Sequence, residues 1–139
     1  MDKVLNYLAL ARKGGRAELG EEPVGAAARA LKAHLILVAE DASDHTWRRA
    51  KSFVAGTNQQ CLRLPVTKEQ MGFVVGRQSL AIAAITDVQL ALAMVTALGQ
   101  PEKHKAVLAV LTEKSEKAKQ RQAEAKAHQR NLRKGGKKK

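Results

Sequence analysis

Acidic side chains form the densest group of residues with catalytic or metal-binding potential in this chain. Glu40, Asp41 and Asp44 follow directly after one apolar segment, and Asp87 follows another. In α/β proteins, ligands bind at the carboxyl ends of strands, and carboxylates there can hold Mg²⁺. One hypothesis is therefore a small α/β nucleotide-binding or Mg-dependent enzyme domain that uses Glu40 and Asp41, joined by Asp87. Capping of the next helix by Ser43 or Asp44 explains part of the same cluster equally well.

The histidines, serines and glycines of the chain do not form the sequence motifs of hydrolases or metalloenzymes. The four histidines are scattered without HxxxH or HExxH spacing, and the chain contains no GxSxG segment. The glycines around position 14 match neither a Walker loop nor a GxGxxG turn. Cys61, the single cysteine, lies in a β-type pattern that favours a core position over a reactive thiol. We expect no catalytic residue, no metal and no cofactor, and hence no enzyme.

Residues 11–41, ARKGGRAELGEEPVGAAARALKAHLILVAED, suggest a different chemistry. A basic turn with two glycines leads into a helix that begins at Gly20, Glu21, Glu22 and Pro23. Backbone amides at a helix N-terminus, beside clustered cations, suit the phosphates of a nucleic acid. The carboxylates of Glu21 and Glu22 either accept hydrogen bonds from guanine imino and amino groups or complement the helix dipole.

Positive charge is concentrated at the C-terminus. The formal net charge is +12; residues 112–139 hold 11 Lys and Arg against 3 Asp and Glu, whereas residues 1–111 hold 14 against 10. We expect a globular domain over 1–111 and a basic, helical or disordered tail over 112–139. This asymmetry indicates an anionic partner, bound in part by a non-specific arm. No apolar run approaches the roughly 18 residues of a membrane helix, and no secretory signal precedes the domain, so we expect a cytoplasmic protein.

Aromatic residues are few and do not form the stacking platform of a single-strand binder. They are Tyr7, Trp47, Phe53 and Phe73. An RNA partner is therefore expected to be folded and to be recognised by its shape, its phosphates and a few base edges. A further alternative is a protein-interaction module whose third helix docks an acidic partner through Trp47, Arg48 and Arg49.

Helix and strand patterns alternate along the chain and must position these residues. Short apolar strands are predicted at 16–19, 34–39, 61–64 and 80–85, separated by segments with helical periodicity. This order predicts an α/β fold, a three-layer α/β/α sandwich with a small mixed sheet of about four strands. A last helix is expected at 104–111, followed by a polar segment whose end, 135–139, is expected to be disordered.

The helix after Gly20 is the element on which the RNA hypothesis depends most. Its apolar positions follow the spacing i, i+3, i+4 and i+7, which predicts that Val24, Ala27, Ala28 and Leu31 face the core. The residues predicted to face outward are Glu22, Gly25, Ala26, Arg29 and Lys32. Small outward residues would let a polynucleotide approach the helix closely.

Four segments between Leu5 and Leu98 together resemble the kink-turn RNA-binding family of ribosomal proteins (L-seven-Ae and L-thirty-e), most closely its bacterial YlxQ-like branch. They are LALARKGGRAELGEE, LILVAEDAS, VTKEQMG followed by VG, and IAAITD. The resemblance implies an α/β/α sandwich that binds kink-turn or bent RNA at the start of the second helix and on nearby loops. We further expect a non-enzymatic monomer that binds ribosomal RNA, the ribosome or ribosome-assembly factors.

The resemblance places the RNA-binding surface on Gly20, Glu21, Glu22, Lys68, Arg77, Gln78 and Ser79. Phosphate contacts are then expected from Arg16, Arg29, Lys32, Lys68 and Arg77. Family members that bind kink-turns follow the glycine with Asn, an acidic or amide residue, and then Lys. This chain instead carries Glu22, Pro23 and Ala26 at those positions, so two of the usual base and phosphate contacts are absent.

Overall fold

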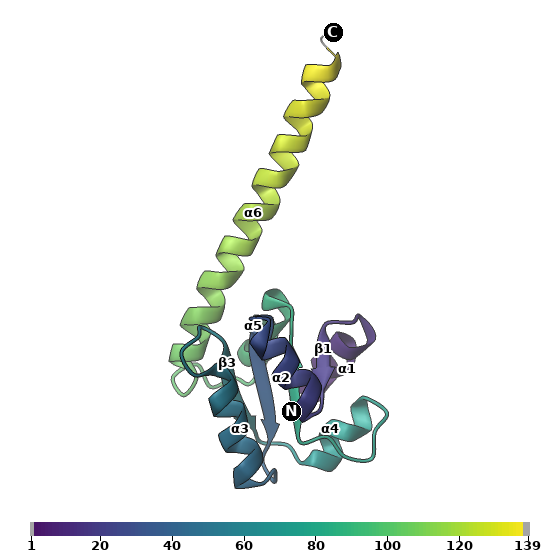
Figure 1. Ribbon diagram of the computed structural model, residues 1–139, viewed down its shortest axis with the longest axis vertical. Helices are drawn as coiled ribbons and strands as arrows, with labels where there is room; N and C mark the ends of the chain where they lie inside the picture. Colours follow the sequence, from purple (N-terminus) through teal and green to yellow (C-terminus); the bar gives the residue numbers. More distant parts are fainter. Residues whose placement is uncertain (1, 138–139) are drawn as a thin grey trace.

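The computed structural model describes residues 2–137: helices and strands alternate as far as residue 97, and one long helix then projects from the body that they form (Figure 1). The elements, in chain order, are α1 (Asp2–Lys13), β1 (Ala17–Leu19), α2 (Glu21–Arg29), β2 (Leu35–Ala39), α3 (Asp44–Val54), β3 (Gln60–Leu64), α4 (Lys68–Val74), β4 (Ile82–Ile85), α5 (Val88–Ala97) and α6 (Lys105–Lys137). All the predicted strands are present.

Within the described residues the strands form one four-stranded sheet in the order β1-β4-β2-β3. The strands β2 and β3 are parallel, whereas β4 runs antiparallel to both β1 and β2. The predicted small mixed sheet is therefore confirmed. The central strand β2 is buried along its whole length, as expected for an apolar strand covered on both faces.

Helices cover the sheet and complete the predicted sandwich. The helices α2 and α3 pack against each other and against the strands, while α1 and α5 pack together and contact β1 and β4 respectively. Side-chain caps begin three of the helices: Ser43 caps α3, Thr67 caps α4 in a capping box with Gln70, and Asp87 caps α5. The cap of α3 is thus Ser43 and not Asp44.

Two predictions about α2 are wrong. The helix ends at Arg29, so Leu31 is not on its inner face and is 62% exposed. The chain leaves the helix through hydrogen bonds from Leu31 N–H to Ala28 and from Lys32 N–H to Ala27, a Schellman motif that puts Leu31 at φ +59°. Gly25 is buried instead of outward, because Phe53 of α3 packs on it; a Cβ there would lie 3.1 Å from that ring.

The helix α6 runs without a break through the expected boundary at residue 111 and includes residues 135–137, which were expected to be disordered; residues 138 and 139 lie outside the described part. Its first part is docked: Leu111 and Ser115 are buried, and Ser115 exchanges hydrogen bonds with Gln89 of α5, at 2.7 and 3.3 Å. Beyond Ala118 the helix is exposed on all sides up to residue 132 and extends away from the body (Figure 1). Within residues 2–137, no helix has the length and apolar character needed to cross a membrane.

Candidate nucleic-acid interface

The sheet separates the predicted binding residues into two groups at its opposite ends. At one end, which we call the loop end, Gly20 N–H donates to Ile82, and the carboxyl ends of β2 and β3 are joined by a hydrogen bond from Glu40 N–H to Val66. At the other end, the arm end, Thr86 N–H donates to Arg16 and Leu35 pairs with Ile85. The antiparallel pairing of β4 creates this separation.

The loop end gathers Gly20, Glu21, Glu22, Lys68, Arg77, Gln78 and Ser79. Gly20 has φ +94°, a conformation that glycine adopts without strain, and it begins α2 without any side-chain cap. The Arg77 guanidinium approaches this turn: its Nη1 lies 3.8 Å from the point where a Gly20 side chain would begin. Uncapped amides and a guanidinium therefore lie side by side, an arrangement suited to an anion.

Backbone contacts hold the loop of Arg77, Gln78 and Ser79 against α4. Arg77 N–H donates to Gly72 at 2.8 Å, and Leu80 N–H donates to Lys68 at 2.9 Å. The loop passes so close to Gly72 that a Cβ there would lie 2.8 Å from backbone atoms of both Arg77 and Ser79. The three loop residues are exposed, and a hollow of about 490 Å³ opens beside them, lined by Asp41, Lys68, Glu69, Gln78 and Ser79.

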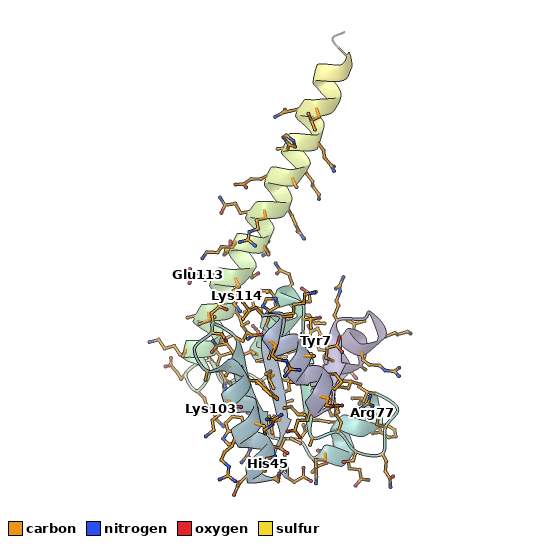
Figure 2. All side chains as sticks on the ribbon, in the orientation of Figure 1. Tyr7, His45, Arg77, Lys103, Glu113 and Lys114 are labelled. Atoms are coloured by element: carbon orange, nitrogen blue, oxygen red, sulfur yellow. The ribbon has the colours of Figure 1, made fainter. Side chains whose placement is uncertain are left out.

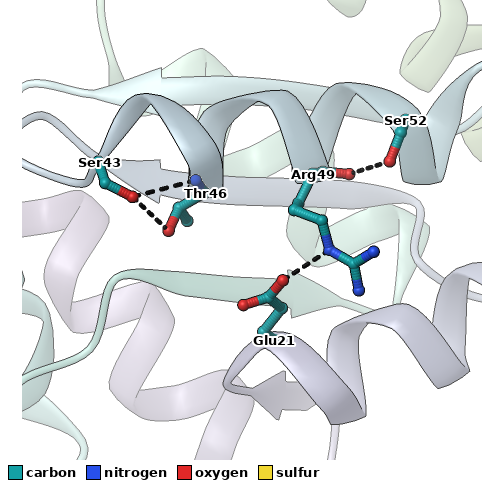
Figure 3. Close-up of polar contacts among 5 residues, drawn as sticks. All are labelled: Glu21, Ser43, Thr46, Arg49 and Ser52. Atoms are coloured by element: carbon teal, nitrogen blue, oxygen red, sulfur yellow. Dashed lines mark hydrogen bonds and ion pairs between the residues drawn. The ribbon is translucent and has the colours of Figure 1, made fainter.

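Glu21 is engaged by a residue that the sequence did not single out as its partner. Its carboxylate accepts a 2.6 Å hydrogen bond from Nε of Arg49, which reaches across from α3 (Figure 3). The guanidinium of Arg49 also lies over the Phe53 ring, 4.9 Å from its centroid. The pair joins two helices that are 28 residues apart in sequence, which is why no local pattern predicted it. Only Glu22 retains an unpaired, exposed carboxylate at this turn among the described residues.

The other predicted phosphate contacts lie away from the loop end. Arg16 is paired with Asp87 at 3.1 Å at the arm end, and Lys32 lies just before the start of β2 there. Arg29, in the last turn of α2, folds back so that its Nη1 lies beside Gly25, next to Phe53. All three side chains are exposed, but Arg16 and Lys32 lie at the end of the sheet opposite to Arg77.

The acidic cluster does not form one magnesium site. Asp41 accepts a 2.8 Å hydrogen bond from Lys68 N–H and so caps the start of α4 at the loop end. Asp87 lies at the arm end, where it accepts from Gln89 N–H and pairs with Arg16. This arrangement does not favour the hypothesis of an enzyme that uses Glu40, Asp41 and Asp87 together, because the antiparallel strand puts Asp87 at the far end of the sheet. Within residues 2–137, no three His, Cys, Asp or Glu side chains gather in a metal-binding arrangement.

At the arm end, α6 approaches the start of β2 through Lys114 and His34. The Lys114 ammonium lies 3.3 Å from Nδ1 of His34, and Figure 2 shows Lys114 where α6 leaves the body. Burial lowers the pKa of His34, the Lys114 charge lowers it further, and Asp87 acts in the opposite direction. Burial also lowers the pKa of Lys114. A neutral imidazole accepting from an ammonium accounts for this arrangement.

Gln59, like the pairing of Arg49 with Glu21, was not predicted from the sequence. It is 2% exposed, accepts a hydrogen bond from Ala33 N–H and donates one to the Ala28 carbonyl at the end of α2. It therefore holds the chain where α2 turns into β2. A polar residue just before a strand was the only available signal, and its partners lie about 30 residues away.

The third-helix hypothesis assumed that Trp47, Arg48 and Arg49 form one docking patch. Arg49 instead faces α2, whereas Trp47 faces β3, with Arg63 and Lys51 at 5.1 and 5.7 Å from its ring centroid. A groove of about 490 Å³ runs past Trp47, Arg63 and Lys103 along the outer edge of the sheet. Cys61, also in its lining, is half-buried, and burial raises the pKa of its thiol. The residues of α3 thus divide between two neighbouring surfaces.

Comparison with known proteins shows the fold. No protein-family model and no curated protein sequence matches the chain. Among solved structures it is similar to a Bacillus halodurans protein of unknown function, with a TM-score of 0.63 and 19% identity over 68% of this chain and 94% of that one. It is also similar to a Giardia lamblia 15.5 kD RNA-binding protein, with a TM-score of 0.55 and 15% identity over 80% of this chain and 83% of that one.

Proposed function

We propose that this protein binds folded RNA at the loop end and has no catalytic role. The observation that carries the proposal is the uncapped start of α2 beside Arg77. The helices α3, α4 and α5 each begin with a side-chain cap that occupies their amides, whereas α2 leaves its first amides to an external acceptor. A phosphate oxygen is an acceptor of the right charge.

The neighbouring groups supply the remaining parts of an RNA contact. Lys68, Gln78 and Ser79 line or border the adjacent hollow and offer a cation, an amide and a hydroxyl to a backbone that continues from α2. Glu22 is the carboxylate left to accept hydrogen bonds from a guanine edge. Glu21 takes a different role from the one expected, because Arg49 holds it and so fixes α3 beside the α2 turn.

The finer specificity proposed is for bent or kink-turn-like RNA, with ribosomal RNA as the natural source. The similarity of the fold to the Giardia RNA-binding protein supports RNA as the ligand. The choice of bent RNA is supported by the family resemblance of the segments from Leu5 to Leu98. Glu22, Pro23 and Ala26 differ from the residues that the family carries at these positions. Selectivity for bent over straight RNA therefore depends on Glu22 and the Arg77 loop.

The test compares a kink-turn RNA with a straight duplex of equal length, using residues 1–118 so that most of α6 is absent. Arg77→Ala is expected to weaken kink-turn binding by about 10- to 150-fold, since hydrogen bonds to a charged group contribute about 1.5–3 kcal/mol. Arg12→Ala, an exposed arginine at the end of α1, is the matched control and is expected to change affinity less than twofold. Equal losses from the two substitutions would exclude the loop end as the binding surface.

Glu22→Ala tests base recognition separately from phosphate binding. Removing one carboxylate acceptor is expected to reduce the preference for the kink-turn over the straight duplex, because phosphate contacts do not discriminate between sequences. A Glu22→Ala protein that binds both RNAs more tightly by the same factor would show that this carboxylate only repels phosphate.

A further inference from the structure

We infer that the exposed part of α6 is a second, separate RNA-binding surface, so that one molecule holds two RNA segments at opposite ends of its body. This inference rests on the proposed function of the loop end. Three observations carry it: the anchoring of α6, the composition of its exposed part, and the direction in which it extends.

The anchoring of α6 makes it a directed arm. Leu111 and Ser115 are buried against the body, and the reciprocal hydrogen bonds between Ser115 and Gln89 fix the rotation of the helix. The contact of Lys114 with His34 adds a third point, on the start of β2. From Ser115 to Lys137 the helix then extends about 33 Å at 1.5 Å per residue.

The composition of the exposed part excludes an apolar partner. Between residues 116 and 132 the apolar side chains are four alanines, at 118, 123, 125 and 127, and the single exposed Leu132. A coiled-coil seam needs bulky residues every 3.5 positions, and a helix lying on a membrane needs a bulky apolar face. Residues 116–132 carry five Lys and Arg against two Glu. A helix that is polar all round and basic fits a polyanion.

The cations have a helical order. Lys119, Lys126 and Arg130 are spaced i, i+7 and i+11, which puts them on one face within an arc of about 40° at 100° per residue. They span about 16 Å of the helix axis. Duplex nucleic acid carries one phosphate per roughly 1.7 Å of its axis in the B form, so a row of this length meets several phosphates of one duplex. Lys117 and Arg121 lie on the opposite face.

The direction of α6 separates this row from the loop end. The helix leaves the body at the arm end and extends away from it, whereas Arg77 lies towards α4 (Figures 1 and 2). An RNA seated on α2 and Arg77 therefore does not reach Lys126 without passing around the whole body. Arg16 and Lys32 are exposed at the end of the sheet from which α6 leaves: Arg16 pairs with Asp87, and Lys32 lies two residues before His34, which contacts Lys114. We therefore assign these two cations to the second surface.

The decisive experiment mixes the full chain with a labelled kink-turn RNA and a differently labelled straight duplex, and measures the mass of the complex by analytical ultracentrifugation. We expect a ternary complex of one protein and two RNAs, with no displacement of the kink-turn RNA by the duplex. Displacement in a 1:1 complex would overturn the inference. A protein that binds the duplex through α6 but ignores the kink-turn RNA would overturn the proposed function and leave the arm as a single RNA site.

Variants locate the second surface. The triple substitution K119Q/K126Q/R130Q is expected to abolish the ternary complex and to lower the salt slope of duplex binding by about 2–3, near 0.9 per lost phosphate contact. Kink-turn affinity should stay within twofold. The control K117Q/R121Q removes cations from the opposite face and should retain the ternary complex. If both sets of substitutions weakened duplex binding equally, the effect would be a general one of positive charge, and Lys119, Lys126 and Arg130 would not form a specific binding row. If the protein bound anionic phosphatidylserine vesicles in preference to the duplex, the partner of α6 would be a membrane and the RNA assignment would be overturned.

Discussion

The two ends of the sheet are built by different means. At the loop end, backbone hydrogen bonds hold a short exposed loop against Gly72, and a glycine begins α2 with its amides uncapped. At the arm end, side chains make the connections: Gln59 to Ala28 and Ala33, His34 to Lys114, Arg16 to Asp87, and Gln89 to Ser115. The loop end thus leaves polar groups available, whereas the arm end uses them to hold the chain together.

This difference has a consequence for mutations. Substitutions at the loop end that keep the fold should act on RNA recognition, because few of its exposed side chains bear on stability. Substitutions at the arm end should act first on stability, since buried polar partners lost there are not replaced by water. Four changes test this division, from the largest expected effect to the smallest.

Gly72→Ala should have the largest effect and should affect both stability and binding. The added Cβ would lie 2.8 Å from backbone atoms of Arg77 and Ser79, which cannot rotate away as a side chain does. Overpacking of this kind costs about 2–3 kcal/mol. We expect a fall of this size in the free energy of unfolding by urea titration, with weaker kink-turn binding because the Arg77 loop is displaced.

Gly14→Ala is the matched control for Gly72→Ala. Its Cβ would meet its nearest atom, the Leu10 carbonyl oxygen, at 3.4 Å, an ordinary contact, so the free energy of unfolding should change by less than about 1 kcal/mol. If Gly72→Ala instead retained both stability and kink-turn affinity, the loop end would not depend on the close packing of its loop.

The fold could be predicted from the sequence because its signals are local. Strand apolarity, the capping box at Thr67 and Gln70, and the cap at Asp87 each involve residues within a few positions of each other. The prediction for Leu31 failed because helical spacing continued past Arg29, whereas the chain had already left the helix in a Schellman motif with no glycine to mark it. Apolar periodicity alone does not show where a helix ends.

The candidate site could be predicted only in part, because only some of its contacts are local in the sequence. Gly20 and its acidic neighbours were visible as a helix start, and the resemblance added Lys68 and the Arg77 loop. The contacts that define the site cross the fold: Arg49 to Glu21, Phe53 to Gly25, and Asp41 to the Lys68 amide. Their separation of roughly 30 residues puts them beyond periodicity and spacing, and only the packing of the elements determines them.

Gln59→Ala should have the next largest effect, and it should lower stability without changing RNA binding. The substitution leaves the buried Ala33 N–H without its acceptor, and an unpaired buried group costs about 1–3 kcal/mol. We expect a loss of about 2 kcal/mol with unchanged kink-turn affinity. Gln60→Ala, at the neighbouring position whose side chain bonds only to the exposed Asn58 carbonyl, is the control and should be close to neutral.

Leu31→Gly should stabilise the protein slightly, whereas Gln59→Ala, at the same end of the sheet, should destabilise it. Leu31 is exposed and holds φ +59°, a conformation that costs a non-glycine residue about 1–2 kcal/mol. Part of this gain is offset by the greater flexibility of glycine in the unfolded chain, so a net increase of about 0.5–1 kcal/mol is expected. Ala30→Gly, at φ −85°, lacks this strain and should destabilise; stabilisation by both would point to a general loosening of the turn.

The smallest effect concerns pH and the anchoring of α6. The pKa of His34 is lowered in the folded protein, so the unfolded chain binds more protons than the folded protein between that lowered pKa and 6.5. The contribution of His34 to stability should therefore be constant above about pH 6.5 and fall as the pH drops below it, since a protonated imidazole can no longer accept from Lys114. Melting temperatures at pH 5 and 8 measure the difference, which His34→Gln should reduce and His128→Gln, on the exposed arm, should leave unchanged. Burial also lowers the pKa of His104, so part of the pH difference should remain in His34→Gln. A pH difference that His34→Gln does not reduce at all would show that the charge state of His34 has no influence on the anchoring of α6.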